Sequence, residues 1–453
     1  MAESFRDKSD FSFSSTNKSQ WKEKLSSDLK GKSIDGVLLK QSSSDFQFET
    51  YRDPSNTIDV VSESLRNALN GKYADFGTAR FWYNRVTIPL NENSRDNSRI
   101  LELLQNGVNG IILSPGETED IDFNSLLKDV DPSYCEISIE TNDPKLRTAF
   151  DYFDFINKSH NPSKIAGTLS IKDPSFLFDN LQTYRDLVDQ NKSANFKVFN
   201  LPSRYFHDKG FSPVEEIAFT LSLLVDLIEK FEDPDKVLPN IEITTSAGVK
   251  YFEEIAKIRA LRYLVQEIAN AYGLSGGNLS DLNIHSTSST FYNTIHDEHN
   301  NLLRNTSSAI SAILGGADAL TILPHDALFS SSNYFSARIA KNISCLLSDE
   351  SHFDKNTDPV AGSYFIEQMT DHTAKKAWAK FQDLENEGGF LNFIKKGSME
   401  NLISEKKELW KDRLVNHDEI LVGFNKYQAE TDIDDEKLGM FKESDSVANY
   451  IEP

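Results

Sequence analysis

The chain has 453 residues, too many for one small hydrophobic core. A prior of about 150 residues per domain suggests about three units, although a (β/α) barrel of about 250 residues counts as one. It carries 48 Lys and Arg against 70 Asp and Glu, a net charge of −22. This average charge repels nucleic-acid phosphates and anionic lipid surfaces, so we expect no nucleic-acid partner and no membrane partner.

The N-terminal region gives no sign of export. Residues 1–20 are polar and Ser-rich, which suggests mobility, and they lack the apolar stretch of a secretory signal. No run approaches the roughly 18 apolar residues of a membrane span. Cys135 and Cys345 form no CxxC motif, and we expect both to be buried, reduced thiols. Together these features predict a cytoplasmic protein.

Predicted elements begin with a helix near Trp21 and a short strand at 34–39. From residue 80 onward, short runs rich in β-branched and aromatic residues recur with the length of strands. The eight runs span residues 81–90, 109–114, 134–140, 166–171, 195–201, 240–245, 281–286 and 317–323.

Helical patterns fill the gaps between these strands. They cover residues 174–190, 213–231, 249–272 and 297–314, the last ended by a Gly pair that suits a helix C-cap. In 249–272, apolar residues recur every three or four positions between charged ones, so we expect a helix buried along one stripe. Eight strands alternating with helices predict an α/β fold, a (β/α)8 TIM barrel.

Beyond the barrel, residues 335–347, 372–387 and 392–413 are expected to be helical. The apolar run at 422–427 suggests a last strand or docking segment, and the acidic tail at 432–453 has little pattern. The predicted domains are an N-terminal arm (1–79), the barrel (80–350), and a C-terminal helical extension with the acidic tail (351–453).

Barrel enzymes place their catalytic groups on loops at the C-terminal ends of the strands. The candidates there are His207, His285, His325, Asp326, Lys172 and Asp173. Such residues could support hydrolysis or proton transfer. A histidine at a strand end is more often a hydrogen-bonded structural group. No GxSxG motif marks an activated serine.

The densest cluster of possible metal ligands is His296, Asp297, Glu298 and His299. A His pair three residues apart can share a helix face, but no third ligand follows at a suitable spacing. The two acidic residues equally suit the first turn of a helix. We therefore expect no metal site. A DxHxxG cobalamin motif is excluded because Leu302 stands in the glycine position.

Several collinear blocks between residues 80 and 430 resemble the methylmalonyl-CoA mutase family of adenosylcobalamin-dependent isomerases. They are 252–260 (family FxExAKxRAxR), 300–304 (NNxxR), 314–320 (GGxxxL), 335–342 (FSxRIARN), 358–364 (DPxAGSY) and 372–390 (AxxAWxxxxxxExxGG). The resemblance implies a barrel and a role in interconverting succinyl-CoA and methylmalonyl-CoA.

The chain departs from the family at its site motifs. Where the family has the tyrosine of WxxRQY, this chain has Thr87, and Ser170 replaces the glutamine of GTIQND. In the family's RTHSQTSG, Asn283 replaces the arginine and Thr287 the glutamine. His207 is a possible relic of the catalytic histidine in YHxxxAG, with shortened spacing. These changes remove the bulky tyrosine side chain, an amide that would orient the substrate, and a guanidinium suited to binding phosphate.

The family also continues with a flavodoxin-like cobalamin-binding domain of more than 100 residues, whereas about 23 residues follow position 430 here. The resemblance therefore implies a non-catalytic small (beta) subunit that binds no cofactor and has no catalytic, cofactor or metal residues. Its heterodimer partner would be a large subunit holding adenosylcobalamin. One alternative is a catalytic acyl-CoA mutase barrel with a separate cobalamin-binding chain. Another is a stand-alone binding protein, or a hydrolase using His207 or His325.

Overall fold

The computed structural model describes residues 16–34, 40–41, 47–48, 79–90, 93–116, 121–274, 282–330, 333–428, 433 and 435–451. The chain forms two compact units, residues 1–56 and 57–453. In the first, α1 (Lys18–Asp28) starts at a capping box between Asn17 and Gln20, and β1 (Lys40–Gln41) pairs with β2 (Gln47–Phe48). The helix predicted near Trp21 is confirmed. Residues 1–15, and residues 35–39 of the predicted strand, lie outside the described part.

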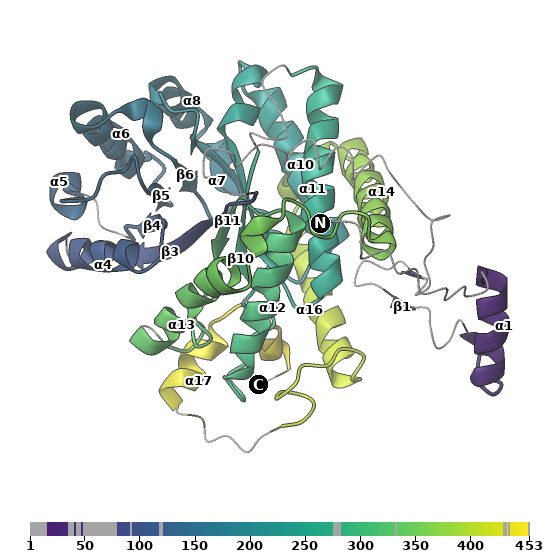
Figure 1. The fold of residues 1–453 in the computed structure, drawn as a ribbon. Coiled ribbons are helices and arrows are strands. Elements are labelled where there is room, and N and C mark those ends of the chain that lie inside the picture. Colours follow the sequence, from purple (N-terminus) through teal and green to yellow (C-terminus); the bar gives the residue numbers. More distant parts are fainter. Residues whose placement is uncertain are drawn as a thin grey trace, which may run out of the picture. The chain divides into compact units, whose positions relative to one another are not determined.

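The second unit is built on a barrel of parallel strands, and all eight predicted strands are confirmed (Figure 1). They are β3 (Tyr83–Pro89), β4 (Gly110–Ser114), β5 (Glu136–Glu140), β6 (Gly167–Ser170), β7 (Phe196–Lys197) with β8 (Phe199–Leu201), β9 (Ile241–Ala247), β10 (Asn283–Ser288) and β11 (Ala319–Thr321). The pairing runs β7-β6-β5-β4-β3-β11-β10-β9-β8. Because β7 and β8 are separated only by Val198, they are halves of one strand that closes the barrel.

Helices follow the strands and surround the barrel. They are α4 (Asn93–Gln105), α5 (Phe123–Leu126), α6 (Arg147–Ser159), α7 (Ser175–Asp179), α8 (Leu181–Gln190), α9 (Arg204–His207), α10 (Pro213–Lys230), α11 (Tyr251–Tyr272), α12 (Asn300–Gly315) and α13 (Tyr334–Cys345). Gly316 ends α12 with a left-handed φ of 104°, as the Gly pair predicts. The helix predicted from residue 297 begins at Asn300, because Asp297 takes a left-handed φ of 49°.

Short 3₁₀ segments join several elements, at Pro162–Lys164, Pro234–Lys236, Leu238–Asn240 and Phe353–Lys355. A π-helical turn at Leu346–Glu350 continues α13. Cys135 and Cys345 are free thiols, as expected, but both are only half-buried.

The prediction that α11 is buried along one stripe is wrong. Lys257, Arg259 and Arg262 are buried to the same degree as its apolar residues. Ion pairs inside the molecule make this possible, because Arg259 reaches Asp358 (2.6 Å) and Arg262 reaches Asp318 (2.5 Å). The helix is enclosed by α10, α12 and a later helix, α14 (Tyr364–Asn386).

The C-terminal region continues with α15 (Gly389–Lys395), α16 (Ser398–Val415), α17 (Asp435–Lys442) and a 3₁₀ turn at Val447–Tyr450. Two helices and one expected strand differ from the prediction. The helix expected at 372–387 begins at Tyr364, and the one expected at 392–413 is interrupted at Gly397, which has a left-handed φ of 68°. Residues 422–427 form a turn with one bridge between Val422 and Lys426, not a strand.

Two apolar cores hold the second unit together. The larger lies between the barrel and its helices. In the smaller, residues of the loops after β10 and β11 (Phe291, Tyr292, Ile295 and Phe329) pack against a group that we call the C-terminal cover: Trp410, Leu414, Leu421, Phe424, Phe441, Val447 and Ala448. The weakly patterned tail thus joins a core. None of the helices in the described part of the chain is long and apolar enough to cross a membrane.

Candidate functional site

A cluster of charged side chains crosses the barrel interior. Arg85 on β3 donates from Nε and Nη2 to Glu136 on β5 at 2.6 and 2.7 Å. Its Nη1 and Nη2 also donate to the two carboxylate oxygens of Glu242 on β9, each at 2.7 Å. Neither β5 nor β9 neighbours β3 in the sheet, so these side chains meet inside the barrel. The cluster therefore occupies the barrel axis.

Strand register explains how Arg85 reaches its partners. Arg85 pairs with Gly110 on β4, and Gly110 pairs with Glu136, so the three residues lie at one level on adjacent strands. A Cβ at Gly110 would come within 2.7 Å of Arg85 Cγ and 3.2 Å of Glu136 Oε2. The missing side chain of Gly110 leaves the space through which the guanidinium reaches β5.

His285 on β10 lies beside this cluster, because its Nδ1 is 3.9 Å from Glu242 Oε1, and its Nε2 lies 2.8 Å from Thr321 Oγ1. Burial, and then the positive charges of Arg85 and Arg204, hold the pKa of His285 well below its usual value, so the ring is neutral. Burial disfavours the charge on Arg85, but Glu136 and Glu242 outweigh it and raise the Arg85 pKa. We call Arg85, Glu136, Glu242 and His285 the Arg85 layer. A neutral histidine beside a fixed ion cluster suits support of the fold.

A second polar network lies at the C-terminal end of the barrel. His207 Nε2 is 2.7 Å from Ser289 Oγ, and His207 Nδ1 is 3.6 Å from Glu216 Oε2. Burial would raise the pKa of Glu216, but the charges and hydrogen bonds of Lys257 and His207 prevail and lower it to about 2. Lys257 Nζ lies 2.8 Å from Glu216 Oε2 and 2.7 Å from Glu254 Oε2. Glu216 is therefore a carboxylate held by fixed donors.

The order Ser289–His207–Glu216 matches that of a hydrolase relay, but its surroundings do not suit catalysis. Ser289, His207 and Glu216 are 3%, 5% and 1% exposed. Ser289 Oγ also accepts a hydrogen bond from Phe291 N at 3.2 Å. The rings of Phe291 and Tyr292 lie edge-on to His207. These contacts enclose the serine hydroxyl and the imidazole within the fold.

The C-terminal cover is bonded to the loops that leave the barrel strands. Val447 N donates to Phe291 O at 2.8 Å, and Ser446 Oγ donates to Asn293 O at 2.6 Å, both in the loop after β10. Trp410 Nε1 donates to Gly210 O at 2.8 Å, in the loop after β8. Loops that hold the active site in barrel enzymes are thus tied to the cover. The C-terminal cover therefore packs over the loops that leave β8 and β10.

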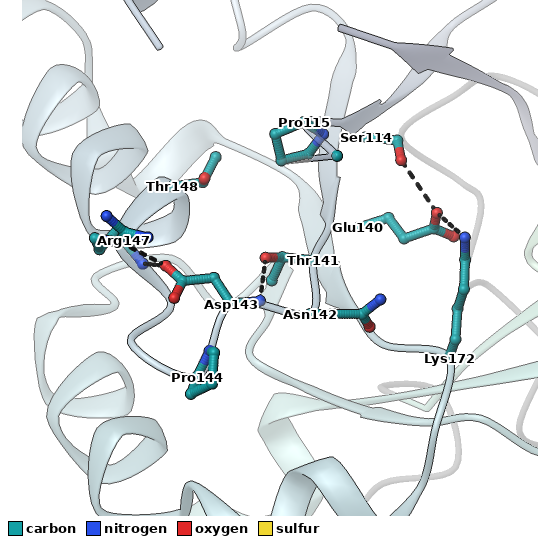
Figure 2. A pocket seen from close by; sticks show the side chains of 11 residues that line it. Ser114, Pro115, Glu140, Thr141, Asn142, Asp143, Pro144, Arg147, Thr148 and Lys172 are labelled. Atoms are coloured by element: carbon teal, nitrogen blue, oxygen red, sulfur yellow. Dashed lines mark hydrogen bonds and ion pairs between the residues drawn. The ribbon is translucent and has the colours of Figure 1, made fainter. Parts of the chain in front are cut away.

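A pocket of about 740 Å³ opens at the C-terminal ends of β4, β5 and β6 (Figure 2). Its lining includes Ser114, Glu140, Asp143, Arg147 and Lys172. The volume falls within the usual range for small-molecule sites, roughly 300–1,000 Å³.

The charges of this pocket are paired. Lys172 Nζ lies 3.0 Å from Glu140 Oε1, and Arg147 Nε donates to Asp143 Oδ2 at 3.0 Å. Partial burial would raise the pKa of Asp143, but hydrogen bonds from Lys145 and Arg147 lower it, so this carboxylate stays charged. Two cations facing two carboxylates leave no net positive charge for the phosphates of coenzyme A. The pocket suits a small polar molecule.

The sequence candidates are dispersed. Lys172 lines the pocket and Asp173 Oδ1 accepts hydrogen bonds from Ser175, whereas His285 belongs to the Arg85 layer. Asp326 is buried and accepts a hydrogen bond from Asn333 Nδ2 at 3.0 Å. His325 is also buried. It lies beside Glu298 and His299, although its position along the chain did not indicate that these residues would meet.

The residues at the family's site motifs are placed on the barrel. Thr87 lies two positions beyond Arg85 on the same face of β3, and Ser170 is the last residue of β6. Asn283 opens β10, and Thr287 Oγ1 lies 3.0 Å from Ser246 Oγ. Sequence reasoning missed Glu136, Glu242 and Glu216. The first two carried one available signal, an acidic residue within a strand pattern that is otherwise typical of burial.

Comparison with known proteins decides the family. A family model described as methylmalonyl-CoA mutase matches residues 121–449. The chain belongs to the methylmalonyl-CoA mutase family. The methylmalonyl-CoA mutase small subunit of Porphyromonas gingivalis is 27% identical to it over 452 residues, covering 94% of this chain and 72% of the relative.

Other members of the mutase family match over shorter regions. The methylmalonyl-CoA mutase of Escherichia coli is 30% identical, covering 52% of this chain and 34% of the relative. The probable small subunit of Mycobacterium bovis is 34% identical, covering 41% of this chain and 31% of the relative. The chain thus aligns with about a third of the length of these two relatives.

Proposed function

We propose that this chain is the non-catalytic small subunit of a heterodimeric methylmalonyl-CoA mutase, which interconverts succinyl-CoA and methylmalonyl-CoA. Its partner is the catalytic large subunit, which holds adenosylcobalamin and substrate. The relatives named small subunits support this assignment. The proposal includes the predicted domains 1–79, 80–350 and 351–453. It also includes a cytoplasmic location, consistent with two free thiols.

The Arg85 layer is the observation that carries the proposal. A thioester held along the barrel axis would have to displace an arginine bonded to two buried carboxylates. Removing one partner from such a cluster typically costs about 3–5 kcal/mol. A few contacts with the substrate would not offset this cost. Thr87, Ser170 and Asn283 also lack the groups that would hold the thioester.

The C-terminal end of the barrel supports placing the cofactor in the partner. There the loops after β8 and β10 are bonded to the C-terminal cover. These residues do not fit a corrin ring, which needs an open, flat face. The alternative, a catalytic barrel served by a separate cobalamin-binding chain, would need both that face and a free axis.

Reconstitution tests the proposal. We expect the chain to co-purify with a full-length large subunit and the pair to interconvert the two thioesters with added adenosylcobalamin. The chain alone, or with only an isolated cobalamin-binding protein, should be inactive. Activity in the latter mixture would contradict the proposal, as would failure to co-purify.

A matched pair of variants separates support from catalysis. His207→Gln in this chain should leave the turnover of the folded heterodimer within about twofold, because His207 contacts Ser289 and Glu216 inside the fold. Substituting the histidine of the YHxxxAG motif in the large subunit should abolish most turnover. A comparable loss from His207→Gln, with assembly intact, would assign this chain a catalytic role.

A further inference from the structure

Three side chains that can bind a metal lie together in the second unit, two of them adjacent in sequence and the third from a later loop. One donor atom each from Glu298, His299 and His325 lies within 4.8 Å of the others. His325 follows β11, while Glu298 and His299 precede α12. Two imidazoles and one carboxylate are a common donor set for zinc.

The buried member of this cluster has an unsatisfied atom. His325 is 4% exposed, and its Nδ1 has no hydrogen-bond partner among the residues that the structure describes. A buried polar atom without a partner destabilises the fold. A cation bound at this nitrogen would satisfy it.

The backbone around the cluster is fixed by Asn301, which is fully buried. Its Nδ2 donates to His325 O at 2.9 Å and to Thr294 O at 2.8 Å. Its Oδ1 accepts from Thr294 N and from Arg304 Nη1. One side chain thus ties the loop after β11 to the start of α12, which holds His325 beside His299.

The ring geometry is close to that of a metal site. The ring centres of His299 and His325 are 5.4 Å apart. Two imidazoles on one tetrahedral zinc, with bonds of about 2.0 Å, place their ring centres roughly 5 Å apart. The donor atoms must close by at most about 1.5 Å to reach the spacing of such a site. His299 is exposed and Glu298 partly so, which leaves these two side chains free to rotate inward.

We propose that Glu298, His299 and His325 form a binding site for a divalent transition-metal ion, best matched by Zn²⁺, with a fourth position open to water. This inference does not depend on the proposed function. Lys437 on α17 lies 3.2 Å from Glu298 Oε2, so the ion and the lysine share one carboxylate. The site therefore lies between the barrel and the C-terminal segment.

Zinc binding to the full chain without a polyhistidine tag tests the proposal, measured by equilibrium dialysis against ZnCl₂ with metal analysis. We expect one ion per chain. His299→Ala and Glu298→Gln, both at solvent-accessible positions, should each weaken binding by at least about tenfold. His352→Asn removes an exposed histidine outside the cluster and should leave affinity unchanged. Circular dichroism verifies that each variant is folded.

Lys437→Ala should change the affinity for zinc in the opposite direction. Removing the competing ammonium should tighten zinc binding several-fold, because two cations no longer share Glu298. Absence of bound zinc in the wild-type chain would overturn the proposal. Equal affinity in the wild type, His299→Ala and Glu298→Gln would also overturn it.

Discussion

Replacing Arg85 with methionine tests whether the Arg85 layer stabilises the barrel as an ion cluster. Arg85→Met keeps most of the side-chain volume but leaves the carboxylates of Glu136 and Glu242 buried and unpaired. Both glutamates are at most 1% exposed. Loss of one partner from a buried ion pair costs about 3–5 kcal/mol. Because a domain is stable by only about 5–15 kcal/mol, this is a large share of the total.

A compensating variant distinguishes the ion cluster from simple packing. If the cost comes from unpaired charge, Arg85→Met combined with Glu136→Met and Glu242→Met should recover to within about 1–2 kcal/mol of the wild type. If it comes from lost packing, the triple variant should be less stable than the single one, because more side chains are disturbed.

Urea denaturation at pH 7, followed by circular dichroism, measures both variants. Lys236→Met is the control, since the exposed pair Lys236–Asp189 should contribute nothing measurable. A free energy of unfolding for Arg85→Met within about 1 kcal/mol of the wild type would refute the role of the layer. A triple variant no more stable than the single one would refute the charge argument.

Three other predictions follow from named contacts. The pKa of Glu216 is about 2 in the fold, below its usual 4.5. The charged Glu216 carboxylate therefore adds about 3 kcal/mol to the free energy of unfolding above pH 4.5, and this contribution is lost as the pH falls toward 2. Glu216→Gln should flatten this part of a stability–pH curve; an unchanged slope would exclude Glu216 as its source. Gly110→Ala should destabilise the barrel by about 1–3 kcal/mol, because its Cβ would meet Arg85 Cγ at 2.7 Å. Gly439→Ala, which meets nothing within 4 Å, is its control in thermal unfolding, and equal midpoints would contradict the reasoning. Trp410→Ala should cost about 3–5 kcal/mol and hasten proteolysis of the C-terminal segment, and wild-type resistance would show that the cover does not depend on Trp410.

The barrel could be predicted because each strand carries its own local signal. Runs such as 109–114 and 240–245 combine β-branched residues with the length of a buried strand, and their alternation with helices restricts the fold. The burial of Lys257 and Arg262 could not be predicted, because their partners Glu216 and Asp318 lie on other elements. The local sequence pattern predicts that such charged side chains are exposed to solvent.

The contacts of the candidate site depended on register, which the sequence does not determine. Arg85, Glu136 and Glu242 meet only because three strands that are not neighbours in the sheet direct these side chains into the barrel interior. The tail was expected to be weakly patterned, since Phe441 and Val447 follow no helical or strand period, yet both are buried. The distance in sequence between His299 and His325 likewise hid that these two side chains lie together.

Ligand stoichiometry in the assembled complex tests the central claim most directly. The heterodimer, purified with its large subunit, is titrated with adenosylcobalamin and then with succinyl-CoA, and bound ligand is counted per complex. Because the Arg85 layer occupies the barrel axis of this chain, we expect one cofactor and one thioester per heterodimer. We expect neither ligand to bind this chain alone. Two of either per heterodimer, or a thioester bound by this chain alone, would contradict the account.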